Sequence, residues 1–283
     1  MTLRNKYIIS KGWQGFGDRL QCLSYCLSIA KTYNRILHVD WRDRIWTHDD
    51  KDFHSYFYFT GVNYVERLDS IELGSIHPSF WETILHKNLD DWVHGIRQWT
   101  ELGLDNFPEE DIWVHNCVGF RRWDFGVLAK HLRLVPEAAT EVAVLMKDFD
   151  PLEPVVHLRG TDKQFSEERW QELRKQAPAA QIVSDDQKLV NRWMDESPSS
   201  RILSDTLVSG SGGGHLMAAK DLSVTKHQMN IRLLADFLII GSAKDAFGLV
   251  TDSCFFEVAR SFVSSGGLEG LFNQQTKSAW DAL

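Results

Sequence analysis

The first forty residues contain two short apolar segments separated by a helical stripe of apolar residues. The segments Lys6–Ile9 and Ile36–Asp40 are each typical of a buried strand. Between them, four apolar residues recur with the spacing of one helix face, namely Leu20, Leu23, Leu27 and Ala30. This pattern predicts a βαβ unit with a right-handed crossover, and it places Asp18 at the N-cap of the helix.

The rest of the chain repeats the alternation of strands and helices. We predict strands at residues 112–115, 155–159, 201–204 and 246–250. We predict helices at residues 136–149, 166–176, 185–196, 230–242 and 252–262. Pro151 and Pro154 bracket a domain boundary, so we divide the chain into residues 1–150 and 151–283. The alternation predicts an α/β protein with two doubly wound domains.

Composition restricts the ligands that such a protein could bind. The chain has 283 residues, of which 43% are hydrophobic and 25% charged, as in an ordinary soluble globular protein. Its net charge of −8 argues against a broad surface for nucleic acid or anionic membranes. Any site for phosphate must therefore be local, and we expect a small phosphorylated ligand.

The four cysteines indicate a reducing compartment. They show no paired metal-ligand spacing, and Cys22 and Cys26 lie one helical turn apart in an apolar segment. The polar start of the chain passes directly into a strand, and nowhere do about 18 apolar residues run together. We expect a cytoplasmic protein without an integral membrane segment.

The segment from Pro154 to Lys163 is the strongest candidate for chemistry. Its apolar run ends at Arg159 and Gly160, so the carboxyl end of a buried strand opens into a polar loop. Ligands of open α/β sheets bind at that edge. Arg159 could bind a phosphate with two hydrogen bonds, and Gly160 would let the backbone approach that phosphate. A strand end whose charges face water fits this segment equally well.

Further polar residues in the second half converge on the same edge. Asp205 ends a strand and precedes the glycine-rich loop 206–214, which could close over a ligand or serve as a plain connection. Asp252 and Ser253 stand where the last strand meets a helix, where free N–H groups and the Ser hydroxyl could receive a phosphate. Asp252 could instead be only the N-cap of that helix.

Asp236 lies within a nearly all-apolar helix. A buried carboxylate there needs a partner such as an N–H group of a ligand. A surface ion pair with Arg232, one turn earlier, is the competing interpretation.

The glycines near the amino terminus give only weak evidence for a dinucleotide. Gly12, Gly15 and Gly17 lie between a strand and a helix, and Asp40 ends the second strand where a ribose-binding acid would stand. Their spacing is not G-x-G-x-x-G, so we favour a loop that shapes a cleft or packs closely.

Three of these regions together resemble the GDP-fucose-dependent fucosyltransferases. They are Gly15–Leu20 with the helix that follows, the segment His157–Lys163, and the region of Asp236 and Ser253. The second segment is similar to the H-x-R-R-T-D-K motif of the α1,6-fucosyltransferases; the protein O-fucosyltransferases and other GT-B fucosyltransferases are more distant. The order and spacing of the regions span nearly the whole chain.

The resemblance implies a GT-B fold of two Rossmann-like domains facing a cleft. The amino-terminal domain would lie on the acceptor side, and the carboxyl-terminal domain would bind GDP-fucose as donor without a metal ion or another cofactor. The resemblance implies that Arg159 binds the β-phosphate and stabilises the leaving GDP, a role that fits the charge gathering on a departing diphosphate. It assigns Glu167 as the general base that deprotonates the acceptor hydroxyl. An ordinary solvent-facing glutamate at a helix start is the competing interpretation.

The same resemblance places several residues at the donor. Asp236 would contact the guanine base and Ser253 the phosphates. The candidate donor contacts are in full His157, Arg159, Asp162, Lys163, Asp205, Asp236, Asp252 and Ser253.

One residue departs from the family pattern. Gly160 stands where the family has a second arginine, which removes one cationic contact to the donor. We expect transfer of fucose from GDP-fucose to a hydroxyl of a glycan, with the acceptor near the Trp- and His-rich segment Trp41–Asn116. A GT-B enzyme with a different nucleotide sugar, or a catalytically silent nucleotide- or glycan-binding protein, is the alternative. Most of the 11 tryptophans are expected in the core.

Overall fold

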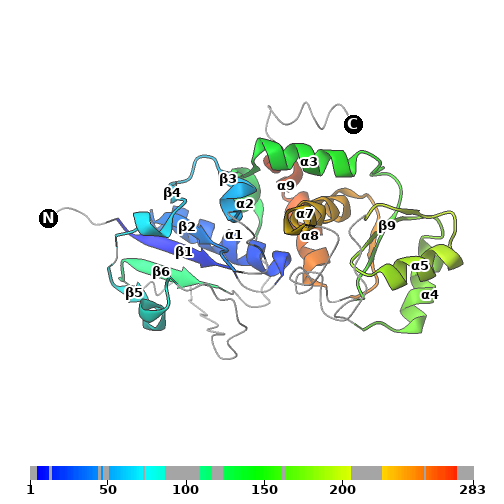
Figure 1. The fold of residues 1–283 in the computed structure, drawn as a ribbon, viewed down its shortest axis with the longest axis horizontal. Coiled ribbons are helices and arrows are strands. Elements are labelled where there is room, and N and C mark those ends of the chain that lie inside the picture. Colours follow the sequence, from blue (N-terminus) through cyan, green and yellow to red (C-terminus); the bar gives the residue numbers. More distant parts are fainter. Residues whose placement is uncertain are drawn as a thin grey trace. The chain divides into compact units, whose positions relative to one another are not determined.

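The computed structural model divides the chain into two compact units, Met1–Val135 and Pro136–Leu283 (Figure 1). It describes residues 5–12, 15–43, 46, 51–72, 74–86, 109–116, 124–160, 164–204, 225–251 and 253–272. Four of the predicted site residues lie outside these ranges, namely Asp162, Lys163, Asp205 and Asp252, and so does the loop 206–214.

The first unit is built on a five-stranded parallel sheet in the order β4-β2-β1-β6-β5. Its strands are β1 (Tyr7–Lys11), β2 (Ile36–Asp40), β4 (Tyr64–Val65), β5 (Ile76–His77) and β6 (Ile112–His115). A separate antiparallel pair joins β3 (Phe57–Phe59) to β7 (Leu132–Leu134). The helices are α1 (Phe16–Thr32) and α2 (Gly126–His131), with 3₁₀ turns at η1 (Phe53–Ser55), η2 (Leu68–Ser70) and η3 (Ser79–Thr83).

The predicted βαβ unit is confirmed, except for its helix cap. Strands β1 and β2 are parallel neighbours and α1 connects them. The helix begins earlier than expected, after Gly15, whose extended backbone serves as the N-cap. Asp18 therefore does not cap the helix, and it lies instead in the first turn, where a negative charge favours the helix dipole.

The second unit contains a four-stranded parallel sheet in the order β10-β9-β8-β11. Its strands are β8 (Val155–Leu158), β9 (Gln181–Ser184), β10 (Arg201–Ile202) and β11 (Ala246–Gly248). The helices are α3 (Pro136–Met146), α4 (Glu167–Gln176), α5 (Gln187–Glu196), α7 (Lys226–Ser242), α8 (Cys254–Ser264) and α9 (Gly267–Leu271).

A tryptophan-containing core joins this sheet to α4 and α5. Trp170 and Trp193 are fully buried, and their rings meet edge to face with centroids 5.3 Å apart. Val156 and Ile182 pack against them from the sheet. Burial of rings this large dominates the packing energy of a core. These two tryptophans are therefore structural, as expected from the sequence.

Cap residues set the helix boundaries that the apolar pattern missed. Helix α7 starts at Lys226 because Thr225 and Gln228 form a capping box, well before the predicted start at Asn230. Helix α8 starts at Cys254, with Ser253 as its N-cap.

The boundary between the two compact units lies at Val135, whereas the prolines suggested residue 150. Helix α3 belongs to the second unit because it packs against α7 there. Glu141 on α3 contacts His227 on α7 at 3.0 Å.

Candidate functional site

The carboxyl edge of the second unit's sheet gathers polar residues from consecutive strand ends. Arg159 follows β8, Asp185 follows β9, and Ser204 lies two residues after β10. Hydrogen bonds join these ends: Ser184 Oγ donates to Leu158 O at 2.8 Å, and Ser184 N donates to Ser204 Oγ at 3.0 Å. The edge that α/β proteins use for ligands is thus a connected polar surface in this unit.

His157 anchors the strand that presents Arg159. Its ring is buried, stacks on Phe256 at a centroid distance of 6.2 Å and lies 5.7 Å from Phe255. Burial and, to a smaller extent, the nearby charge of Arg159 together lower the pKa of His157 to about 3. The imidazole is therefore neutral at pH 7, and it supports the loop by packing rather than by charge.

Leu189 fills the space beside Gly160. A Cβ atom on this glycine would lie 2.3 Å from Leu189 Cδ1 and 3.0 Å from Asp186 Oδ2. The backbone N–H of Gly160 donates to Asp185 Oδ1 at 3.2 Å. A side chain at position 160 would thus need Leu189 to move, which gives the glycine a packing reason.

Two acids at this edge escaped the sequence analysis. Asp185 accepts from the loop that follows Arg159, and Asp186 is the N-cap of α5, accepting from Lys188 N at 2.8 Å. The signal in the sequence was the pair of acids directly after the segment Gln181–Ser184, which forms β9. They were instead included in the predicted helix, which started at Asp185.

Glu167, the predicted base, lies at the start of α4 with its side chain 59% exposed. Arg192 Nη2 donates to Glu167 Oε1 at 2.6 Å, and Gln171 Nε2 donates at 2.9 Å. These hydrogen bonds lower the pKa of Glu167, and the one from Arg192 contributes most. Arg192 is in turn stacked on the Trp170 ring at 4.2 Å. Glu167 is therefore a paired carboxylate of lowered pKa, and both hydrogen bonds reach the same oxygen, Oε1.

Asp236 forms a buried network rather than the surface pair considered from the sequence. Arg232 Nε donates to Asp236 Oδ1 at 2.7 Å, and Ser204 Oγ donates to Oδ2 at 3.2 Å. Both charged side chains are largely buried. The Arg232 partner was foreseen correctly, and the burial and the link to the β10 end were not. Asp236 is thereby attached to the polar edge.

Ser253 meets the same edge from the side of β11. Its hydroxyl accepts from Phe256 N at 3.5 Å and caps α8, and the residue is buried. The capping role weighed for Asp252 thus falls to its neighbour. The N-terminus of α8 beside Ser253 carries the positive end of the helix dipole, which favours anions.

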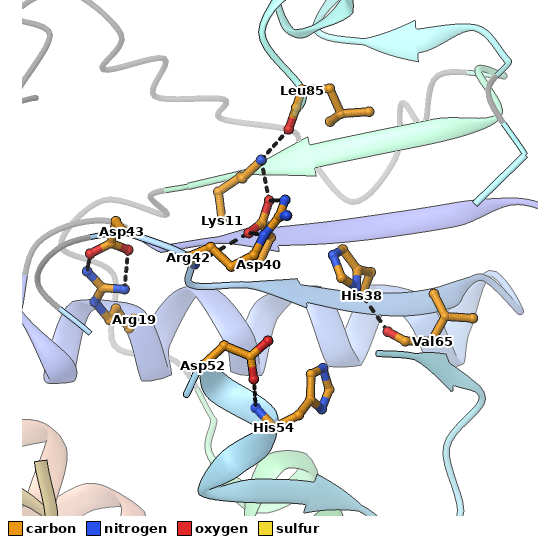
Figure 2. Close-up of polar contacts among 10 residues, drawn as sticks. All are labelled: Lys11, Arg19, His38, Asp40, Arg42, Asp43, Asp52, His54, Val65 and Leu85. Atoms are coloured by element: carbon orange, nitrogen blue, oxygen red, sulfur yellow. Dashed lines mark hydrogen bonds and ion pairs between the residues drawn. The ribbon is translucent and has the colours of Figure 1, made fainter. Parts of the chain in front are cut away.

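The glycine loop of the first unit does not match a dinucleotide site. Asp40, in the place of a ribose-binding acid, forms ion pairs with Lys11 and Arg42 (Figure 2). A Cβ on Gly12 would lie 2.2 Å from Arg19 Nη1 and 2.4 Å from Asp43 Oδ2. The glycine thus allows close packing against an ion pair, one of the roles expected for it.

The next two observations, on metal sites and on membrane-spanning helices, apply only to the described ranges of the chain. Within them, no group of three or more His, Cys, Asp and Glu side chains is arranged to hold a metal ion. No helix in these ranges combines the length and the apolar character needed to cross a membrane.

Comparison with solved structures identifies the fold. The chain matches the NodZ α1,6-fucosyltransferase soaked with GDP-fucose at 18% identity and a TM-score of 0.68, covering 92% of this chain and 93% of that one. The fucosyltransferase NodZ from Bradyrhizobium matches at 17% identity and a TM-score of 0.67, over 91% and 93% of the two chains. POFUT1 in complex with GDP matches at 12% identity and a TM-score of 0.52, over 93% and 97%.

These matches show that the two parallel α/β units form the GT-B fold of solved fucosyltransferases, as the sequence predicted. No protein-family model matches the chain. No curated protein sequence matches it either.

Proposed function

We propose that this protein is a metal-independent inverting glycosyltransferase that moves fucose from GDP-fucose to a hydroxyl of a glycan. The observation that carries the proposal is the position of Arg159 at the carboxyl edge of a parallel sheet, in a chain whose fold matches that of solved fucosyltransferases. Ser253 at the start of α8 and Asp236 beside Ser204 border the same edge and support it.

In the proposed reaction, each side chain binds one part of the donor through its charge or its hydrogen bonds. The guanidinium of Arg159 binds the diphosphate and neutralises the charge that gathers as the bond to fucose breaks. The α8 N-terminus and the Ser253 hydroxyl bind phosphate oxygens. Asp236, oriented by Arg232, accepts from N–H groups of guanine.

Glu167 is the proposed base, and its pairing defines a condition on that role. The carboxylate takes the proton of the acceptor hydroxyl as the oxygen attacks the anomeric carbon of fucose and GDP leaves. Arg192 lowers the pKa of Glu167 and so weakens it as a base, and Oε2, which neither Arg192 nor Gln171 binds, is the oxygen that would take the proton.

Calorimetric titration with GDP, UDP and GDP-mannose tests the donor. We expect the protein to bind GDP, and Arg159→Ala to weaken binding about 10- to 100-fold, because a charge-assisted hydrogen bond contributes ~1.5–3 kcal/mol. Arg201→Ala is the matched control, since Arg201 lies in the same unit, 43% exposed, and pairs with Glu153. Release of GDP from GDP-fucose without acceptor would establish donor and activity together. Tight UDP binding without GDP binding refutes the proposal.

Specific observations keep two other functions open. Gly160, packed against Leu189, favours a different nucleotide sugar, because the second cation of the family pattern is missing. The pairing of Glu167 with Arg192 favours a silent nucleotide- or glycan-binding protein. Activity with a donor panel separates these cases. A cytoplasmic location stays part of the proposal.

A further inference from the structure

Arg169 connects helix α4 to the end of strand β11. Its Nη2 donates to Gly248 O at 2.9 Å, and its Nη1 donates to Glu172 Oε2 at 2.8 Å. Gly248 is the last residue of β11, so the guanidinium lies at the carboxyl edge of the second unit's sheet, although Arg169 itself belongs to a helix. Arg169 is not among the predicted donor contacts, because its position in the sequence gives no sign of this long-range contact.

The end of β11 lies beside the end of β8. Gly248 is the register partner of His157 in the parallel pair that these two strands form. The chain leads from His157 to Arg159 in two residues and from Gly248 to Ser253 in five. The Arg169 guanidinium is therefore anchored where the two loops that carry the proposed phosphate contacts begin.

The contacts of Arg169 leave part of its hydrogen-bonding capacity unused. Its Nε is buried and has no hydrogen-bond partner among the residues that the structure describes. The side chain of Glu172, three residues later on the helix, is 53% exposed. Such a surface ion pair contributes little to stability, whereas a guanidinium forms strong hydrogen bonds with phosphate oxygens. Nη1 can thus exchange Glu172 for a phosphate oxygen while Nη2 keeps its contact with Gly248 O.

The leaving group of the proposed reaction requires more than one positive charge. A diphosphate gathers negative charge as its bond to the sugar breaks, and a single guanidinium does not neutralise all of it. His157 is neutral at pH 7, and Arg232 forms an ion pair with largely buried Asp236. Lys163 is a predicted contact outside the described ranges, and it would add to the positive charge at this edge. Arg169 is, by contrast, a described cation whose charged partner is exposed.

We infer that Arg169 binds the diphosphate of the donor as a second cation beside Arg159. This inference rests on the proposed function, to which it adds a residue of α4, the helix that begins with Glu167. Arg169 supplies from the helix the positive charge that Gly160 cannot supply from the loop. Its contact with Gly248 holds the guanidinium at the edge before the donor binds, so binding costs little conformational freedom.

Titration of the full chain with GDP by calorimetry and with guanosine by NMR tests this role. We expect Arg169→Ala to weaken GDP binding about 10-fold, as the loss of a charge-assisted hydrogen bond does. Guanosine binding should not change, because guanosine has no phosphate. Arg169→Gln retains a donor for Gly248 O and removes the charge, so it should show the same loss of GDP affinity even if Arg169→Ala does not fold.

Two control variants separate phosphate binding from a structural role. Arg174→Ala removes a guanidinium of the same helix that pairs with Glu196, and the Arg174 side chain is 25% exposed, like that of Arg169. This variant should bind GDP as the unmodified protein does. Glu172→Gln removes the contact that Arg169 gives up when the donor binds, so its GDP affinity should equal or exceed that of the unmodified protein.

Several outcomes overturn the inference. They are unchanged GDP affinity in Arg169→Gln, an equal loss of guanosine affinity, an equal loss in Arg174→Ala or Glu172→Gln, or no nucleotide bound at all. UDP titration of the same samples reports separately on the proposed donor. UDP binding that Arg169→Gln weakens, without GDP binding, would refute only the donor, and GDP binding that Arg169→Gln leaves unchanged would refute only the role of Arg169.

Discussion

Replacing Gly160 by alanine tests whether Leu189 excludes a side chain beside Arg159. The added Cβ would lie 2.3 Å from Leu189 Cδ1, about 1 Å closer than an ordinary van der Waals contact allows. Leu189 is partly buried at the rim of the Trp170 and Trp193 core, so a shift of its side chain changes its packing there. Overpacking of this kind costs about 1–3 kcal/mol.

Removing the Leu189 side chain should reverse the sign of the effect that Gly160→Ala has on stability. In a Leu189→Ala background the obstructing methyl groups are gone, and Asp186 Oδ2 at 3.0 Å is the remaining close neighbour. Since alanine restricts the unfolded chain more than glycine, Gly160→Ala should there be neutral or stabilising by up to ~1 kcal/mol. The coupling between the two sites should therefore be about 1–4 kcal/mol.

Thermal unfolding of the four proteins measures this coupling. For a unit of this size each 1 kcal/mol changes Tm by about 2–4 °C, so a cost of about 1–3 kcal/mol for Gly160→Ala alone should lower Tm by about 2–12 °C. A single variant that unfolds like the unmodified protein, or equal effects of Gly160→Ala in both backgrounds, would refute the packing explanation for this glycine.

Three other predictions concern the candidate site. Glu167→Gln should abolish transfer and leave GDP affinity nearly unchanged, with the neighbouring Glu168→Gln as control; retained turnover removes Glu167 from the mechanism. His157 binds a proton in the unfolded chain below pH 6.5 but in the folded chain only near pH 3, so stability falls as the pH decreases through this window. His157→Phe should reduce the slope of unfolding free energy against pH by up to ~1.4 kcal/mol per unit, and an unchanged slope in denaturant titrations at several pH values contradicts this. Asp236→Asn should destabilise the fold by about 3–5 kcal/mol in the same titrations, because buried Arg232 loses its counter-charge, and a loss below ~1 kcal/mol would show that the pair is not buried in solution.

Many of the regular elements could be predicted because they follow from local patterns, although β3, β7, β9 and α2 were missed. Ile36–Asp40 and Ile112–His115 are strands with the predicted limits, since each is a short apolar run between polar residues. The end of α4 at Gln176 was also predicted correctly. The two-residue strands β4 and β5 were missed, because so short a strand has no periodicity and is defined only by its neighbour.

The contacts that decide chemistry depend on residues far apart in the chain. Arg192 on α5 reaches Glu167 on α4, and Leu189, also on α5, reaches Gly160 after β8. No spacing rule predicts such pairs, because they follow from how the helices pack on the sheet. The candidate residues could thus be predicted from the sequence, and their ionisation and available space could not.

Glu167 shows why residue type and spacing alone do not establish a catalytic role. The sequence supports a carboxylate eight residues after Arg159, and the structure adds a guanidinium that competes for it. Arg192 is not free to leave without cost, because it also donates to Glu196 at 2.9 Å and stacks on Trp170. Arg192 and Gln171 both bind Oε1, so Oε2 can still take a proton, and the guanidinium weakens the base by lowering its pKa rather than by blocking it.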